Sequence, residues 1–247
     1  MLSDIALEGI EEKYFVYINT FLRQGLSNLI DGLNSRIGIL NDWKKQFLKT
    51  ARAGYNPSDL EAGAERILHH LFSPLFKFPN SCPVGSDLMY RTEEAIIHIE
   101  VKTTLITNRS DYKGKVQLGK NQISYINPRF TPDLHFYYKS VGLPTLTYVI
   151  QIIHEHMKPK INALNVICIP NGQLFKHYGP NILQAGKGGW AKAKDIRYNY
   201  ARQPYFLLLK QRDSKDIFRI EILILDKNLP IKELTGKNLQ LVPFKVI

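Results

Sequence analysis

Residues 94–102 alternate apolar and polar side chains, which is the pattern of a β-strand with one buried face. Successive side chains of a strand point to opposite faces of the sheet, so one face of this segment is apolar throughout. That face is formed by Ala95, Ile97, Ile99 and Val101. The other face carries Glu94, His98, Glu100 and Lys102, with Ile96 among them. Charged groups on such a strand are costly to bury unless they are paired or hydrated, so the segment predicts a sheet that carries a polar site.

The strand before this segment supplies a further carboxylate. Residues 84–90 and 95–104 flank the polar turn 91–94, which predicts an antiparallel hairpin. The return of the chain can place Asp87 of the first strand beside Glu100 of the second. Glu100 and Lys102 point to the same face and lie roughly 7 Å apart along the strand, at about 3.3 Å per residue.

Two carboxylates that converge with a lysine have the chemistry of a hydrolytic metal site. Oxygen ligands suit Mg²⁺, which keeps several of its waters when a protein binds it. A nearby lysine can orient such a water or stabilise developing negative charge. The alternative is a solvated Glu-x-Lys pair on the surface. The presence of Asp87, the apolar back face and a basic flank favour the metal site.

The start of the chain has helical periodicity. Apolar residues recur at three- and four-residue spacing from residue 2 to about residue 54, with interruptions near Gly25, Gly32 and Gly38. A further helix is expected to open at Pro57, where Ser58 and a glutamate three residues later fit a capping box. We therefore predict a helical N-terminal region over residues 1–55 and a second region, the main body of the chain, over residues 56–247.

Strand patterns dominate after the second helical segment. Residues 146–153 and 164–169 are apolar and β-branched runs of strand length, and residues 206–209 and 218–225 are predicted to form another strand pair. Together with the hairpin they predict an α/β (α+β) fold. The expected architecture is one compact domain with a mixed central sheet flanked by helices and a helical N-terminal layer.

Composition narrows the class of protein. A hydrophobic content of 44% excludes a disordered chain, and no apolar run approaches the length of a membrane span, so we expect no membrane association. The two cysteines are too few for a disulfide framework, which fits a reducing, cytoplasmic compartment. The formal charge of +11 favours a polyanionic partner. Residues 81–100 nevertheless carry four acidic side chains against one basic side chain, so an acidic island lies within basic surroundings.

The hairpin resembles a known nuclease signature. Gly85-Ser86-Asp87, twelve further residues and then Glu100-Val101-Lys102 are similar to the motif of the PD-(D/E)xK nuclease superfamily, and most similar to its type II restriction endonuclease members. The resemblance covers about forty residues. Ser86 stands where the motif has a proline, which supports geometry and carries no chemistry.

The resemblance implies roles for particular residues. Asp87, Glu100 and Val101 would bind Mg²⁺, for which Mn²⁺ can substitute, and Lys102 would position or activate the attacking water. A glutamate from the preceding helix, Glu65 in preference to Glu61, would join the site. Gln122 would sit on the helix after the lysine, near the active site. His98 shares the polar face but is interpreted as a hydrogen-bonded neighbour of the site.

Two basic stretches are candidate DNA-binding segments, because lysines and arginines bind phosphates while amides and arginines can read base edges. A solvated basic loop is the alternative for the second stretch. The first stretch follows the catalytic strand and contributes Lys113, Lys115, Gln117, Lys120 and Asn121. The second contributes Lys187, Lys192, Lys194, Arg197, Tyr198, Asn199, Arg202 and Gln203.

The resemblance implies a prokaryotic type II restriction endonuclease that cleaves double-stranded DNA at a short sequence, leaving 5′-phosphate and 3′-hydroxyl ends. A homodimer is expected, because both strands of a palindrome are cut, and a cognate DNA methyltransferase acting on the same site is implied. Two alternatives stay open. One is a structure-directed nuclease of the junction-resolvase or repair type, and the other is a non-catalytic DNA-binding module.

Overall fold

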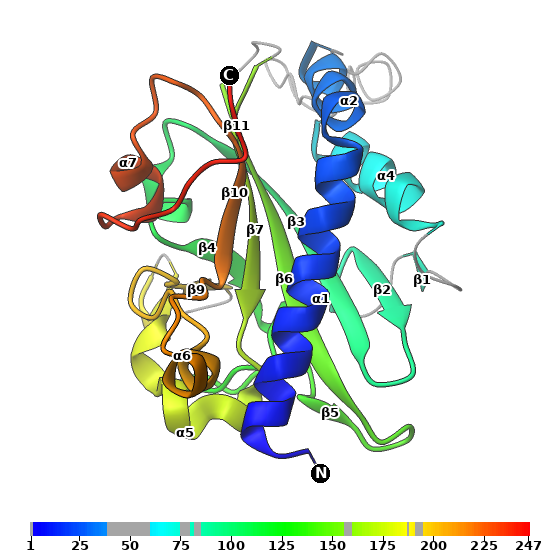
Figure 1. The fold of residues 1–247 in the computed structure, drawn as a ribbon, viewed down its shortest axis with the longest axis vertical. Helices are drawn as coiled ribbons and strands as arrows, with labels where there is room; N and C mark the ends of the chain where they lie inside the picture. Colours follow the sequence, from blue (N-terminus) through cyan, green and yellow to red (C-terminus); the bar gives the residue numbers. More distant parts are fainter. Residues whose placement is uncertain are drawn as a thin grey trace.

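The computed structural model describes residues 2–38, 60–74, 80–81, 85–155, 160–186, 188–190 and 195–247. These residues form a mixed α/β fold, as predicted (Figure 1). The predicted helix start at Pro57 and Ser58 lies outside the described residues. No helix within the described ranges is long and apolar enough to cross a membrane.

The N-terminal region forms two helices, α1 (Asp4–Gln24) and α2 (Leu26–Gly38). The side chain of Ser3 caps α1 by accepting a hydrogen bond from the amide of Ala6 at 3.3 Å. The predicted break at Gly25 is confirmed, since this residue ends α1. The predicted break at Gly32 is wrong: it lies within α2, where its lack of a side chain leaves room for Ile67 of the neighbouring helix α4 (Leu60–Phe72). Gly38 is the last residue of α2.

The central sheet is mixed, with described strands in the order β1-β2-β3-β6-β7-β10-β11, and β5 pairs beside β6. The pairings β3–β6 and β10–β11 are parallel, and the others are antiparallel. The strand bounds are β1 (Asn80–Ser81), β2 (Leu88–Arg91), β3 (Ile96–Leu105), β5 (Tyr137–Tyr138), β6 (Leu143–His154), β7 (Ile161–Ile169), β10 (Ile220–Leu225) and β11 (Lys245–Val246).

A smaller antiparallel sheet and several short helices complete the described fold. The small sheet has the order β4-β9-β8, with β4 (Val116–Gly119), β8 (Leu183–Ala185) and β9 (Asp195–Tyr198). The α-helices are α5 (Phe175–Tyr178), α6 (Leu207–Asp213) and α7 (Ile231–Thr235). The 3₁₀ turns are η1 (Arg109–Asp111), η2 (Lys120–Gln122), η3 (Gly172–Leu174) and η4 (Pro180–Ile182).

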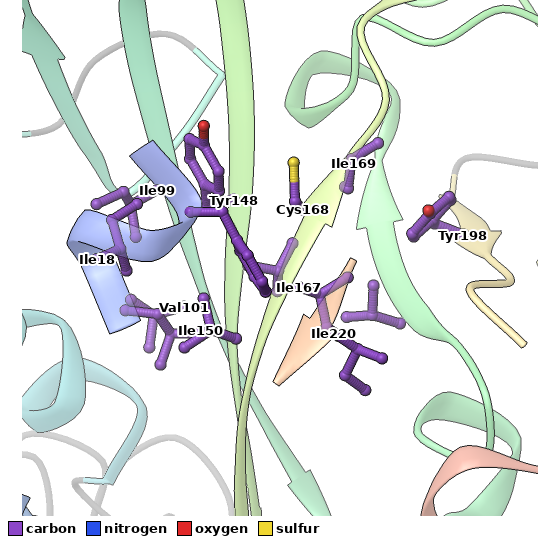
Figure 2. Close-up of a cluster of buried hydrophobic side chains, with 14 of the residues drawn as sticks. Ile18, Ile99, Val101, Tyr148, Ile150, Ile167, Cys168, Ile169, Tyr198 and Ile220 are labelled. Carbon is purple, nitrogen blue, oxygen red and sulfur yellow. The ribbon is translucent and has the colours of Figure 1, made fainter. Parts of the chain in front are cut away.

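Helix α1 runs lengthwise across the sheet and contacts β6, β7 and β10, while α4 packs against β3 and α2 (Figure 1). The apolar face of β3 supplies part of the core beneath them. Figure 2 shows Ile18 of α1 beside Ile99 and Val101, with Ile150 of β6 close by. The predicted apolar face is thereby confirmed, and the alternate residues of β3 point away from α1.

The predicted hairpin is confirmed, with β2 and β3 antiparallel and Leu88 opposite Ile99. The strands predicted at 146–153, 164–169 and 218–225 correspond to β6, β7 and β10. The strand predicted at residues 206–209 is wrong, because this segment begins α6. Leu208 and Leu209 donate their backbone N–H groups to the buried carboxylate of Glu8, at 2.7 and 2.8 Å, and a tertiary contact thus starts a helix where the local pattern favours a strand.

Candidate active site

The centre of the candidate site is Glu100, whose side chain is only 1% exposed although it carries an ionisable group. Its strand, β3, lies inside the sheet between β2 and β6. Lys102 lies on the same face of β3 and places its Nζ 2.5 Å from Oε1 of Glu100. Gln122 of η2 also donates its Nε2 to that Oε1 atom. The predicted approach of Gln122 to the site is therefore present in the structure.

The second carboxylate oxygen of Glu100 is left open. Oε2 is buried and has no hydrogen-bond partner among the described residues. Burial raises the pKa of Glu100 to about 7, and the neighbouring charge of Asp87 adds to this rise, while Lys102 opposes it. A buried carboxylate with one unsatisfied oxygen gains stabilisation from any cation that approaches that oxygen.

Asp87 precedes β2 and reaches across the end of the hairpin to β3. Its Oδ2 accepts a hydrogen bond from the backbone N–H of Val101 at 2.7 Å. The pairing of β2 with β3 ends at Leu88 and Ile99, so the carboxylate replaces the neighbouring strand as the partner of this N–H group. The predicted convergence of Asp87 with Glu100 is supported by this geometry and by the mutual effect of their charges.

The turn before Asp87 explains the Gly-Ser-Asp sequence. Gly85 has a φ of +96°, and a Cβ at this position would collide with the backbone carbonyl of Asn121. Ser86, which stands where the related motif has a proline, donates its hydroxyl to the carbonyl of Leu88 at 2.9 Å. This local bond holds the turn that a proline ring would otherwise restrict.

A divalent cation fits the residues present. Among the described residues there is no group of three or more His, Cys, Asp or Glu side chains with metal-binding geometry, which excludes a metal cage of that kind within those ranges. Mg²⁺ needs only one or two carboxylates and keeps several waters. Asp87 and the open oxygen of Glu100 supply these, and the carbonyl of Val101 faces the same edge as its N–H group, toward Asp87.

His98 lies on the same face of β3 but has another environment. Its Nε2 lies 3.1 Å from the hydroxyl of Tyr138, and burial lowers its pKa to about 4, so the ring is neutral near pH 7. The interpretation of His98 as a hydrogen-bonded neighbour agrees with this contact. Glu65 is half-buried on α4, the helix that packs against β3, and its role in the site stays a prediction. The side chain of Glu61 lies outside the described part of the chain.

The two predicted DNA-binding stretches meet in the structure. Lys113 and Lys115 of the first stretch line one groove together with Asn199, Arg202 and Gln203 of the second. Three residues of the first stretch lie elsewhere: Gln117 donates to Asp195 at 2.6 Å, Lys120 pairs with Asp133 at 3.3 Å, and Asn121 is exposed. Lys187, Lys192 and Lys194 lie outside the described residues.

Arg197 and Tyr198 do not reach the surface. Tyr198 is fully buried in β9, and Arg197 is buried with its Nη2 2.6 Å from Oδ1 of Asp111. The guanidinium also donates through Nε to the carbonyl of Ser110 at 3.1 Å. We therefore correct the prediction that these two side chains contact DNA. The sequence pattern could not distinguish an exposed arginine from one that pairs with a distant aspartate.

A second hollow, of about 510 Å³, opens beside Lys102. It extends from Lys102 past Asn108 and Asp111 to Gln117 and Asp195. The sequence interpretation missed both aspartates. A signal was present, because Asp111 is the only acidic residue in the basic stretch 101–130, and a lone acid among cations often serves as their buried partner.

Comparisons with known proteins agree with this arrangement. The chain matches the family models of the type II restriction enzyme MwoI, its N-terminal domain over residues 4–158 and its central domain over residues 161–220. No curated protein matches the sequence.

Two solved structures share the fold. The restriction endonuclease BglI, bound to its DNA recognition sequence, has 17% sequence identity and a TM-score of 0.57, covering 89% of this chain and 93% of BglI. The tetrameric restriction endonuclease SfiI, bound to cognate DNA, has 16% identity and a TM-score of 0.57, covering 90% of this chain and 85% of SfiI. At these identities the likeness concerns the fold.

Proposed function

The chain belongs to the family of the type II restriction enzyme MwoI, and we propose that it uses Mg²⁺ to hydrolyse both strands of DNA at a short recognition sequence. The observation that carries this proposal is the buried Glu100. Its Oε1 is held by Lys102 and Gln122, while its Oε2 is open beside Asp87. Such an arrangement leaves a place for a cation next to a lysine that can act on a water or a phosphate.

Asp87, Glu100 and the carbonyl of Val101 are the residues that would hold the cation. When bound, Mg²⁺ supplies positive charge that polarises a phosphoryl oxygen and lowers the pKa of a coordinated water. Asp87 is held for this role by the N–H of Val101, and Glu100 is oriented by Gln122. Mn²⁺, which accepts the same oxygen ligands, is expected to substitute.

Lys102 is the proposed catalytic cation. Its side chain is 28% exposed, so its Nζ can contact both the buried Glu100 and a substrate phosphate. From this position the ammonium orients the attacking water and stabilises the charge that develops on the phosphoryl oxygens. In the proposed reaction the water oxygen bonds to phosphorus in line with the bond to the 3′ oxygen. That bond breaks, and the products are a 5′-phosphate and a 3′-hydroxyl.

The proposed assembly is a homodimer on double-stranded DNA. Two copies of the site would cut the two strands of a symmetric sequence. The proposed subunit contact lies in the helical N-terminal region, and its support is that Ile5, Val16 and Tyr17 of α1 are exposed apolar side chains. A cell that contains such an enzyme must protect its own sites, so we also propose a DNA methyltransferase that modifies the same sequence.

Digestion of a plasmid of known sequence tests this function. Purified protein is incubated with the plasmid in Mg²⁺, in Mn²⁺ and in EDTA, and the ends of the products are sequenced. We expect discrete fragments with 5′-phosphate ends in either metal and none in EDTA. Lys102→Ala should produce no fragments, while Lys215→Ala, an exposed lysine outside the site, should cut like the wild type.

The alternatives predict different products. A structure-directed nuclease would cut branched DNA and leave the linear plasmid sequence without discrete fragments. A binding module would retain the plasmid in a mobility assay and leave it intact in Mg²⁺. Equal cutting by Lys102→Ala and the wild type would contradict the proposed site.

A further inference from the structure

A groove of about 830 Å³ lies next to the candidate active site and contains many cations. Three chain segments form most of it: residues 109–115 after the catalytic strand, residues 199–203 after β9, and residues 236–237 after α7. Figure 1 shows β4, β9 and α7 on the same flank of the molecule. We call this hollow the basic groove. Its cationic side chains are Arg109, Lys113, Lys115, Arg202 and Lys237.

The charges of the basic groove are only partly neutralised. None of the described residues that line it is acidic. Glu233, just outside it, lies 2.6 Å from Arg109 and 3.2 Å from Lys113. No acidic side chain among the described residues forms an ion pair with Lys115, Arg202 or Lys237. Three cations therefore face the groove without a counter-charge from that part of the chain, and a polyanion would be attracted to them.

The groove is held in shape by close packing at Gly114. This residue has a φ of +70°, and a Cβ there would lie 2.7 Å from both the Ala201 side chain and the Thr235 carbonyl. Its N–H donates to the carbonyl of Leu234 at 2.9 Å, and its carbonyl accepts from the N–H of Ala201 at 3.0 Å. The three walls are thus joined at one glycine. A preformed groove binds a ligand with a lower ordering cost than a flexible one.

Tyr200 adds a second junction between the same walls. Its buried hydroxyl lies 3.0 Å from the carbonyl of Tyr112 and 3.3 Å from the carbonyl of Leu234. The cations of the groove are therefore mounted on backbone segments that are fixed to each other. The backbone positions of Lys115 and Arg202 are fixed relative to each other by these bonds.

The side-chain amides that line the groove are also available to a ligand. Deeper in the body, Gln151, Asn165 and Asn171 bond to neighbouring groups within the fold. The side chains of Asn199 and Gln203 have no such hydrogen bond within the described structure. Amides can donate and accept at base edges or at sugar and phosphate oxygens, so they complement the cations around them.

The basic groove adjoins the hollow that contains Lys102. Asn108 and Asp111 line that hollow, while the intervening Arg109 and Ser110 line the groove. Arg197 holds the boundary between them, because it bonds to Asp111 on one side and to the carbonyl of Ser110 on the other. A strand whose phosphate lies at Lys102 would thus pass directly to the groove.

We propose that the basic groove binds the DNA backbone beside the cleaved phosphate, with Lys115, Arg202 and Lys237 each contacting a phosphate. The identity of the polyanion rests on the proposed function. Lys237 was not part of the sequence prediction, since it lies far along the chain from both basic stretches. Asn199 and Gln203 contribute hydrogen bonds but no charge in this assignment.

The salt dependence of DNA binding tests the proposal. Binding of a fluorescent duplex is measured in EDTA over a range of salt concentrations for the wild type and for Lys115→Ala, Arg202→Ala and Lys237→Ala. Each substitution should reduce the slope of log K against log salt by about 0.9, because one phosphate contact releases about that many counterions. The corresponding loss of affinity is about eightfold at 0.1 M salt. The triple variant should lose nearly three slope units.

Three control variants separate this role from a general effect of charge or folding. Lys215→Ala and Lys227→Ala remove exposed cations outside the groove and should leave the slope unchanged. Asn199→Ala should lower affinity without changing the slope, because it removes no charge. A triple variant with the slope and affinity of the wild type would overturn the proposal. The salt dependence of binding is measured separately from plasmid cleavage. The role of the basic groove can therefore be refuted while the proposed cleavage is confirmed, and the proposed cleavage can be refuted while the role of the groove is confirmed.

Discussion

Two clusters of buried carboxylates in this chain differ in how their oxygens are used. The first lies beneath α1, where Glu8 and Glu11 meet Arg219, and all three side chains are fully buried. Arg219 lies 3.2 Å from Oε1 of Glu8 and 2.6 Å from Oε2 of Glu11. The second lies on the face of β3 that points away from α1, where Glu100 meets Lys102 and Asp87.

Every carboxylate oxygen of the first cluster has a donor. The other oxygen of Glu8 accepts two backbone N–H groups at the start of α6, and the other oxygen of Glu11 accepts the N–H of Asn171 at 2.6 Å. In the second cluster both donors go to Oε1 of Glu100, and Oε2 has none among the described residues. The comparison indicates a structural role where the oxygens are saturated and a chemical role where one is left open.

The largest expected effect is on cleavage by Glu100→Gln. The substitution keeps the shape of the side chain and removes its charge, so plasmid cleavage in Mg²⁺ should fall by about 1000-fold or more. The thermal midpoint should stay the same or rise, because a buried and incompletely paired charge is lost. Glu93→Gln, on the exposed turn of the same hairpin, is the matched control and should cut normally.

In the first cluster, by contrast, we expect a substitution to lower the stability of the fold. Arg219→Ala leaves two buried glutamates without their cation and should lower the free energy of unfolding by about 3–5 kcal/mol. Urea denaturation measures this loss. Arg212→Ala, which breaks the exposed pair with Asp213, should change stability by less than about 1 kcal/mol. Equal stability of these two variants would show that the buried cluster stabilises the fold no more than an exposed ion pair does.

The two clusters also show how much of the structure could be predicted from the sequence. Asp87, Glu100 and Lys102 were predicted because a strand pattern and a short spacing bring them together over sixteen residues. The cluster of Glu8, Glu11 and Arg219 was not predicted, since Arg219 lies more than 200 residues along the chain from the two glutamates and no local pattern links them. Arg197 was misinterpreted as a DNA contact for the same reason.

For the fold, too, local patterns could be predicted from the sequence and long-range contacts could not. The helices and the main strands follow from local periodicity, and these were predicted correctly at residues 95–104, 146–153 and 164–169. The segment at 206–209 was predicted as a strand, because only the distant Glu8 makes it a helix. Beyond the hairpin of β2 and β3, the order of the strands in the sheet was not predicted, as it depends on packing between segments far apart in the chain.

The open oxygen of Glu100 should make metal binding sensitive to pH. The pKa of Glu100 is raised to about 7, so protons compete with the cation below that value. Mg²⁺ affinity should fall by about tenfold per pH unit below pH 7, or about 100-fold by pH 5. Calorimetric titration at several pH values measures this trend.

The same group affects stability without metal, with a definite sign. Because the folded pKa is raised, Glu100 contributes stability below its unfolded pKa of about 4.5, and this contribution is lost as the pH rises through about 7. The stability of Glu100→Gln should lack this decrease with rising pH, because glutamine does not titrate. A Mg²⁺ affinity in the wild type that is constant from pH 5 to pH 8 would contradict the assignment of Glu100.

The smallest expected effect concerns the residue that orients Glu100. Gln122→Ala removes the donor to Oε1 and should reduce cleavage by about tenfold, in the range of one buried hydrogen bond to a charged group. It should also shift the pH midpoint of cleavage upward, because the carboxylate loses a stabilising donor. A purely structural role would leave that midpoint unchanged. Gln211→Ala, exposed on α6, is the control.

Single-turnover cleavage by Asp87→Asn tests the central claim most directly. This variant keeps a side-chain oxygen beside the N–H of Val101 but removes one of the two proposed carboxylate ligands. Plasmid DNA in Mg²⁺ should be cut about 1000-fold or more slowly than by the wild type, with duplex binding in EDTA and thermal stability retained. Cleavage within tenfold of the wild-type rate would show that the open carboxylate cluster is not the site of hydrolysis.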